Sequence, residues 1–119
     1  MVDDKRKKRI DEQIKRELGN VLLRNPKYPI FKQITITSVD VSVDLSVAKV
    51  LFSVFDEAKV TDAGKILKDE SGFLRKMLAR NLNLRLTPRL YFVYDDSIKK
   101  SQQLSALIDE AILKDEKKN

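Results

Sequence analysis

AGKILKDESGFLRKMLARNLNLRL, residues 63–86, contains two short helical patterns that meet at Ser71-Gly72. An apolar stripe runs along the second pattern and is made of Leu74, Met77, Leu78 and Leu82 at helical spacing. A glycine inside a helix costs about 1 kcal/mol relative to alanine, so Ser71 and Gly72 predict a kink between two helices. The stretch therefore predicts a helix–kink–helix.

The opposite side of the second helix is cationic. At about 100° per residue it carries Arg75, Lys76, Ala79, Arg80 and Asn83. No acidic residue occurs from Phe73 to Tyr94, although a solvated helix face usually mixes both signs of charge. The missing carboxylates favour contact with a polyanion; a plain solvated face is the alternative. Asn81 interrupts the apolar stripe, and we expect it to hydrogen bond to a neighbouring element.

The chain has 119 residues, and we expect residues 1–119 to form one domain with a modest core. Its net charge of +6 favours an acidic partner such as nucleic acid. The lack of cysteine and histidine excludes disulfides, zinc fingers, thiol nucleophiles and histidine-based catalytic or metal sites. No apolar run approaches the ~20 residues that span a bilayer, and the charged N-terminus is no secretory signal. We expect a cytoplasmic protein without metal or cofactor.

The first segment predicts a helix that ends near Arg24, before Asn25-Pro26. Asp3 or Asp4 is its expected cap, and its apolar stripe consists of Ile10, Ile14, Leu18 and Val21. The first turns carry five consecutive basic residues, Lys5, Arg6, Lys7, Lys8 and Arg9. This run is either a solvated helix start or an electrostatic contact with nucleic acid, and the sequence favours neither.

Residues 32–44 and 47–55 alternate as two strands. The apolar residues change parity between Ile36 and Val39, which predicts a bulge near Thr37-Ser38. The link between the strands is too short for a parallel crossover, so we expect an antiparallel hairpin. Its residues Val50, Phe52 and Val54 should face the helices. A third strand, 89–94, must join the hairpin, because a lone strand cannot satisfy its backbone.

The helix pair should follow an N-cap at Thr61 or Asp62 and end near Asn83. A final helix carries an apolar stripe that we expect to pack on the core, made of Leu104, Leu107, Ile108, Ala111 and Ile112. Residues 1–4 and 114–119 are expected to be frayed. The order α-β-β-α-kink-α-β-α predicts an α+β domain, with a three-stranded sheet and helices on one face.

This order resembles the type II KH fold, and two stretches are more specific: VSVDLSVAKVLFSV (Val41–Val54) and ESGFLRKMLARNLNLRLTPRLYFVYDDS (Glu70–Ser97). The second contains SGFLR, LA-x-x-L-x-LR and P-x-L-x-F-x-x-D-x-S in order. Together they resemble the ribosome-binding factor A family of bacterial small-subunit assembly factors, over nearly the whole chain. The GxxG loop of ordinary KH domains is absent. Glu70 replaces the alanine of the family's Ala-x-Gly kink, which argues against phosphate contact by the kink itself. Arg89 stands where an acidic residue is common.

The resemblance implies a non-catalytic, monomeric RNA-binding factor that acts in the cytoplasm on immature 30S subunits. It implies binding to small-subunit ribosomal RNA, support of late 16S 5′-end maturation, release from the mature subunit, further contact with ribosomal proteins and a role in adaptation to cold. Lysine and arginine would bind phosphates. The first candidates are Arg75, Lys76, Arg80 and Arg85, and the further ones are Lys5, Arg6, Lys7, Lys8, Arg9, Lys65, Lys68 and Arg89.

The sequence is also compatible with two other functions. A small metal-dependent nuclease could use Asp95-Asp96, Asp40 and Asp44, although turn and cap chemistry explains these carboxylates better. A DNA-binding or protein-interaction module, unrelated to ribosome assembly, could use the basic face or the stripe of the final helix. Core packing is the simpler explanation for that stripe.

Overall fold

The computed structural model describes residues 4–118 and, in the last helix, the side chains of residues 97, 100–109 and 111. The elements follow in the order α1 (Asp4–Arg24), η1 (Pro29–Gln33), β1 (Ile34–Val41), β2 (Val47–Val54), η2 (Glu57–Lys59), α2 (Val60–Asp69), α3 (Ser71–Asn81), β3 (Arg89–Tyr94) and α4 (Ser97–Lys118). This confirms the predicted order of helices and strands.

The sheet has three strands in the order β1-β2-β3. β1 and β2 form the expected antiparallel hairpin, and β3 pairs with β2 in parallel. The register shifts between Ile36 and Ser38, which confirms the predicted bulge. β1 begins at Ile34 rather than at Lys32, because Pro29 starts a short 3-10 helix that ends at Gln33.

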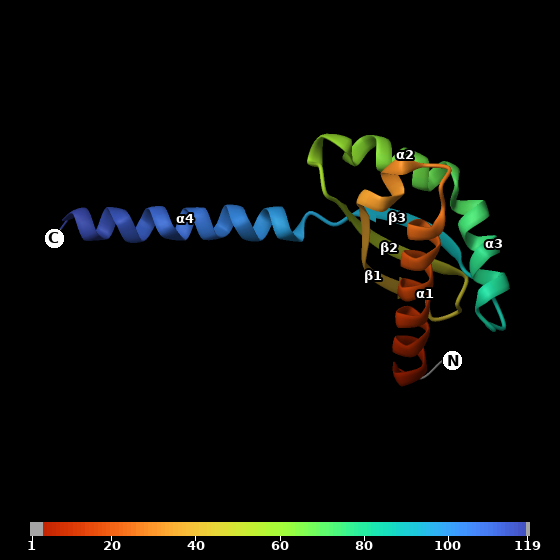
Figure 1. The fold of residues 1–119 in the computed structure, drawn as a ribbon. Helices are drawn as coiled ribbons and strands as arrows, with labels where there is room; N and C mark the ends of the chain where they lie inside the picture. The colour runs from red at the N-terminus through yellow and green to blue at the C-terminus, as the bar shows by residue number, and fades with distance from the viewer. Residues whose placement is uncertain (1–3, 119) are drawn as a thin grey trace.

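Helices α1, α2 and α3 pack on one face of this sheet (Figure 1) and contribute to one buried cluster with it. Val50, Phe52 and Val54 are buried in that cluster, as predicted, with exposed fractions of 0%, 2% and 7%. The apolar stripe of α1 is buried over its whole length, from Ile10 to Val21. α3 contributes Leu74 and Leu78, while Met77 and Leu82 are half-buried at its margin.

The last helix departs from the expectation. α4 projects from the domain instead of packing on its core (Figure 1). Leu104, Leu107 and Ile108 are 59%, 63% and 51% exposed. The sheet face that packs against helices is already covered by α1, α2 and α3. The spacing of the apolar stripe therefore correctly predicted that α4 is a helix, but it did not predict that the stripe is exposed. α4 also runs to Lys118, through residues expected to be frayed, and the side chain of Ile112 lies outside the described ones.

Two helix boundaries also differ from the prediction. α2 begins at Val60 without a side-chain cap, so neither Thr61 nor Asp62 is its N-cap. The preceding turn η2 is capped instead by Asp56, which accepts from Ala58 N at 3.1 Å. α3 ends at Asn81, because the next residue is extended. α1 begins at Asp4; the alternative cap Asp3 and residues 1–2 and 119 lie outside the described part. Judged by length and hydropathy together, none of the described helices could span a bilayer.

Candidate nucleic-acid interface

The helices α2 and α3 meet at Glu70, whose φ of −94° and ψ of 6° break the helical geometry. The predicted kink is therefore present but lies immediately before Ser71-Gly72. Gly72 does not have a positive φ, and a Cβ added to it would meet no atom within 4 Å. Hydrogen bonds of 2.9 Å continue across the bend, from Glu70 N to Ile66 O and from Leu74 N to Glu70 O. The bend does not depend on glycine.

Glu70 also ties this junction to the loop that follows α1. Its carboxylate accepts a hydrogen bond from Tyr28 Oη at 2.7 Å and lies 3.4 Å from Lys27 Nζ. The side chain is only 15% exposed. The hydrogen bond from Tyr28 and the charge of Lys27 hold the pKa of Glu70 below its usual range. The carboxylate that departs from the family pattern is thus ionised and paired, and its role is to hold the junction in place.

A groove of about 580 Å³ runs between α2 and β3. Lys65, Lys68 and Ser71 line its helical side, and Tyr91, Phe92 and Tyr94 line its strand side. β3 is an end strand of the sheet, so the backbone groups along one of its edges are not paired within the sheet. Tyr91 is 63% exposed. The position of Tyr91 beside α2 could not be predicted from the sequence, because only the strand order shows that β3 is an edge strand.

The outer face of α3 is cationic, as predicted. Lys76 and Arg80 are exposed. Arg75 is also exposed, but its Nε and Nη2 donate to Thr87 O at 3.1 and 2.9 Å. Two of its five donors therefore hold the loop between α3 and β3. Arg75 has a structural role that the sequence did not show.

The hydrogen bond predicted for Asn81 is present in the structure. Its Nδ2 donates to Glu17 Oε1 on α1 at 2.7 Å. The bond joins the last turn of α3 to α1 at the surface of the protein. The interruption of the apolar stripe is thereby explained.

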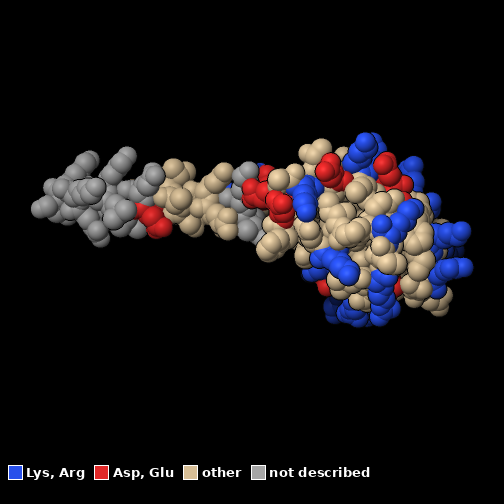
Figure 2. Space-filling view, turned by 45° about the horizontal axis from the view of Figure 1, so that its top comes forward, with Lys and Arg blue, Asp and Glu red and all other residues tan. Residues whose placement is uncertain are grey.

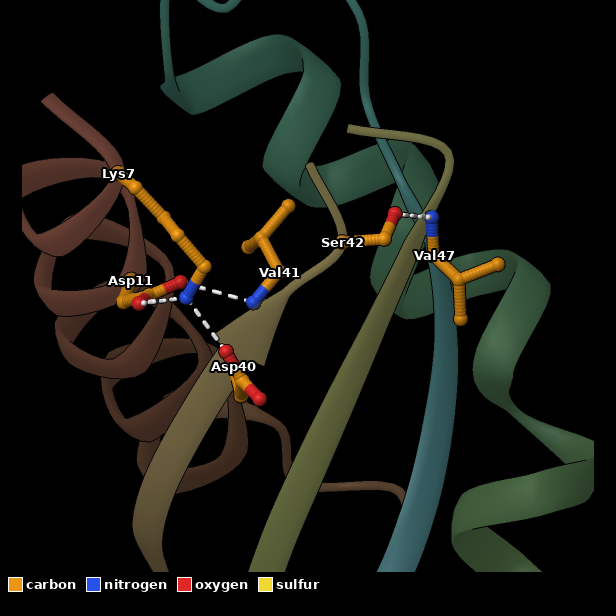
Figure 3. Close-up of polar contacts among 6 residues, drawn as sticks. All are labelled: Lys7, Asp11, Asp40, Val41, Ser42 and Val47. Carbon is orange, nitrogen blue, oxygen red and sulfur yellow. Dashed lines mark hydrogen bonds and ion pairs between the residues drawn. The ribbon is translucent and has the colours of Figure 1, made fainter. Parts of the chain in front are cut away.

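The five consecutive basic residues at the start of α1 lie in different surroundings, and Lys7 is the one that pairs with the sheet. Lys7 Nζ lies 3.0 Å from Asp11 Oδ2 and also donates to Asp40 Oδ1 on β1 (Figure 3). Asp11 Oδ1 accepts from Val41 N at 2.9 Å. The bonds to Asp40 and then to Asp11 raise the pKa of Lys7. Lys7 thus ties α1 to the sheet and is a poor candidate for RNA contact.

The other predicted cations fall into separate places. Arg6 and Arg9 line a second pocket together with Arg85, whereas Lys5, Lys8 and Arg89 are exposed and line neither pocket. Figure 2 shows Lys and Arg around the globular part, with dense groups at its lower and right margins. Acidic side chains gather at the root of α4, and along the upper edge they alternate with basic ones.

The carboxylates considered for a nuclease have structural partners. Asp95 accepts from Thr37 Oγ1 at 2.7 Å and from Ser97 N at 3.0 Å, and both bonds lower its pKa. Asp96 lies 3.3 Å from Lys100 Nζ. Asp44 stabilises the β1–β2 turn, and Asp40 pairs with Lys7 as described above. Within the described residues, no group of three or more acidic side chains could hold a metal ion.

Comparison with known proteins gives consistent matches. The model of the family described as "Ribosome-binding factor A" matches residues 6–108. A ribosome-binding factor A from Pseudomonas aeruginosa strain UCBPP-PA14 is 40% identical over 116 residues, covering 95% of this chain and 90% of the relative. The factor from Thioalkalivibrio sulfidiphilus is 41% identical over 114 residues, covering 95% of this chain and 88% of the relative.

Solved structures agree with these sequence matches. The crystal structure of ribosome-binding factor A from Thermus thermophilus has a TM-score of 0.67 and 30% identity, covering 74% of this chain and 94% of that one. A Thermus thermophilus RbfA homology model, fitted into the cryo-EM map of a 30S–RbfA complex, has a TM-score of 0.60 and 29% identity, covering 72% of this chain and 91% of that one. Structures of this group have a KH-like fold, the fold described above. The chain belongs to the ribosome-binding factor A family.

Proposed function

We propose that this protein binds the small ribosomal subunit and acts there as an assembly factor. One observation carries the proposal: the chain belongs to the ribosome-binding factor A family. A structurally similar protein, RbfA from Thermus thermophilus, has been fitted as a homology model into the cryo-EM map of a 30S–RbfA complex. The contact surface that we assign is the groove between α2 and β3 together with the outer face of α3.

The groove has the chemistry of a site for single-stranded RNA. Lys65 and Lys68 at its rim would bind phosphates, and Tyr91 beside them offers an exposed ring for a base. The unpaired edge of β3 adds backbone donors and acceptors. Because a GxxG loop is absent, we assign the phosphate contacts to side chains rather than to the backbone of the junction.

The outer face of α3 extends the surface with Lys76 and Arg80. The span from Phe73 to Tyr94 contains no carboxylate that would repel phosphate. Each cation that neutralises a phosphate releases a counterion, so binding should weaken as salt increases. Arg75 can contribute its remaining donors while it holds the loop before β3.

We further infer that the protein acts by holding ribosomal RNA rather than by cleaving it. The structural partners of Asp40, Asp44, Asp95 and Asp96 support this. In this proposal the bound protein supports late 16S 5′-end maturation in the cytoplasm and leaves once the subunit is mature.

Co-sedimentation with purified free small subunits, compared with complete ribosomes, tests the function. We expect binding to free subunits that falls with salt, and weaker binding to complete ribosomes. Equal affinity for duplex DNA and for small-subunit ribosomal RNA would instead indicate a general nucleic-acid binder. Cleavage of RNA in the presence of Mg²⁺ or Mn²⁺ would contradict the non-catalytic role.

A further inference from the structure

A second pocket lies between the first turns of α1, the β1–β2 turn and the loop before β3. Its volume is about 160 Å³. Three arginines line it, Arg6, Arg9 and Arg85, together with two residues that carry side-chain amides, Gln13 and Asn83. None of the described residues that line it is acidic. We call it the arginine pocket.

The rest of its lining is apolar and consists of Ile10, Val41, Leu45, Leu84, Leu86 and Pro88. A site for a bare anion needs cations and N–H donors but no apolar floor. A site for an apolar ligand would not gather three arginines, because such sites carry only a few polar groups. An apolar floor with cations and amides around it matches a nucleotide, which joins a flat base to a phosphate.

The wall formed by α1 is held in place by the cluster in Figure 3. Asp11 binds Val41 N, and Lys7 joins Asp11 to Asp40. These bonds connect the turns of α1 that carry Arg6 and Arg9 to the end of β1. The arginine side chains therefore project from a backbone that is fixed before any ligand binds.

The other two walls are fixed by similar means. In the β1–β2 turn, Asp44 Oδ1 accepts from Ser46 N at 3.1 Å and from Ser46 Oγ at 2.7 Å. The loop before β3 is held by Arg75, which donates to Thr87 O, and by Arg89 N, which donates to Ser46 O at 2.9 Å. A pocket with ordered walls loses less conformational entropy when it binds a ligand.

We propose that the arginine pocket binds one unstacked nucleotide of single-stranded RNA. The base lies on Leu84 and Leu86 within reach of the two amides, and its phosphate lies between Arg9 and Arg85. The volume of about 160 Å³ suits one base, since sites for drug-sized ligands measure about 300–1,000 Å³. The inference rests on the proposed function for the source of the nucleotide. It adds a second site, separate from the groove between α2 and β3.

The test is an NMR titration of the full chain with AMP, with the tetranucleotide rA4 and with inorganic phosphate. We expect AMP and rA4 to shift the methyl signals of Leu84 and Leu86 and the side-chain amides of Gln13 and Asn83. Phosphate should leave the methyl signals unchanged. If the source is RNA, rA4 should bind about tenfold or more tightly than AMP, because it carries more phosphates.

Three variants separate the contributions. Arg85→Ala should weaken AMP and rA4 about tenfold or more, because a charge-assisted bond to phosphate is lost. Leu86→Ala should weaken AMP but not phosphate, because Leu86 contacts only the base. Arg85 and Leu86 are both exposed, so neither substitution should unfold the protein. Arg16→Ala, an exposed arginine on the same helix but outside the pocket, is the matched control and should change neither.

Equal affinity for AMP and phosphate, with no effect of Leu86→Ala, would reduce the pocket to a bare anion site and overturn the inference. Shifts confined to the groove around Tyr91 would also overturn it. So would rA4 binding no more tightly than AMP, which would indicate a free nucleotide. Small-subunit binding by the wild type without any response in the pocket would refute this inference alone. A response in the pocket without subunit binding would support the pocket and refute the proposed function.

Discussion

Replacing Asp11 by alanine should destabilise the fold markedly, because this side chain joins α1 to β1. Asp11 is 13% exposed, accepts from Val41 N at 2.9 Å and pairs with Lys7 at 3.0 Å. Alanine would leave the N–H of Val41 without its partner, at about 1–3 kcal/mol. The lost ion pair adds about 0.2–1 kcal/mol. We expect the free energy of unfolding to fall by about 2 kcal/mol in total.

Urea unfolding followed by circular dichroism measures this change. Asp11→Asn retains an oxygen that can accept from Val41 N but lacks the charge, so it should cost only about 1 kcal/mol or less. Glu12→Ala, at the exposed next position of α1, is the control and should stay within about 0.5 kcal/mol of the wild type. A loss below about 0.5 kcal/mol for Asp11→Ala would refute the argument that this carboxylate fixes α1 to the sheet.

Three further predictions concern the junction, the loop before β3 and the β1–β2 turn. Gly72→Ala should raise the free energy of unfolding by up to about 1 kcal/mol in thermal unfolding, because the added Cβ meets nothing within 4 Å. Gly19→Ala in α1 should do the same for the same reason. A loss of stability in Gly72→Ala would show that the bend requires glycine. Arg75→Ala should cost about 1 kcal/mol in urea unfolding by removing its bonds to the loop, whereas equal costs for Arg75→Ala and Lys76→Ala would contradict that role. The pKa of Asp44 is lowered from 3.8 to about 2, chiefly by hydrogen bonds from flanking serines, so its stabilisation is full above pH 3.8 and is lost as the pH falls towards 2. Asp44→Asn should therefore flatten the dependence of stability on pH in this window, and an unchanged dependence would exclude the turn as its source.

Much of the fold follows from periodicity in the sequence. The change of parity between Ile36 and Val39 predicted the bulge, because successive side chains of a regular strand point to opposite faces of the sheet. The alternation of Val50, Phe52 and Val54 likewise predicted the buried face of β2. These features depend on local spacing alone, which the sequence contains in full.

The features that could not be predicted are contacts between residues that lie far apart in the chain. Lys7 is one of the further candidates for RNA contact, and the sequence does not show that Asp40 on β1 pairs with it. Arg75 is a first candidate for phosphate contact, and the sequence does not show that two of its donors bind the carbonyl of Thr87. The stripe that includes Leu107 on α4 has the spacing of a core helix, yet it is exposed. Composition and spacing do not reveal which tertiary neighbour a side chain meets.

The candidate site was predicted in part for the same reason. The cationic face with Lys76 and Arg80 follows from helical phase, and both side chains are exposed. The groove that brings Lys65 near Tyr91 depends on β3 lying at the edge of the sheet, beside α2. The gathering of Arg9 and Arg85 in one pocket likewise depends on the packing of α1 beside the loop before β3.

The central claim is that the cationic face of α3 binds ribosomal RNA through phosphate charge. Its most direct test is the salt dependence of binding to free small subunits for the double variant Lys76→Ala/Arg80→Ala. The control is Arg16→Ala/Lys32→Ala, which removes the same charge from the groove between α1 and β1. We predict weaker binding and a slope of log affinity against log salt that is smaller by roughly 1.4–1.8 units, with a much smaller change in the control. Wild-type affinity and slope in the α3 variant would contradict it.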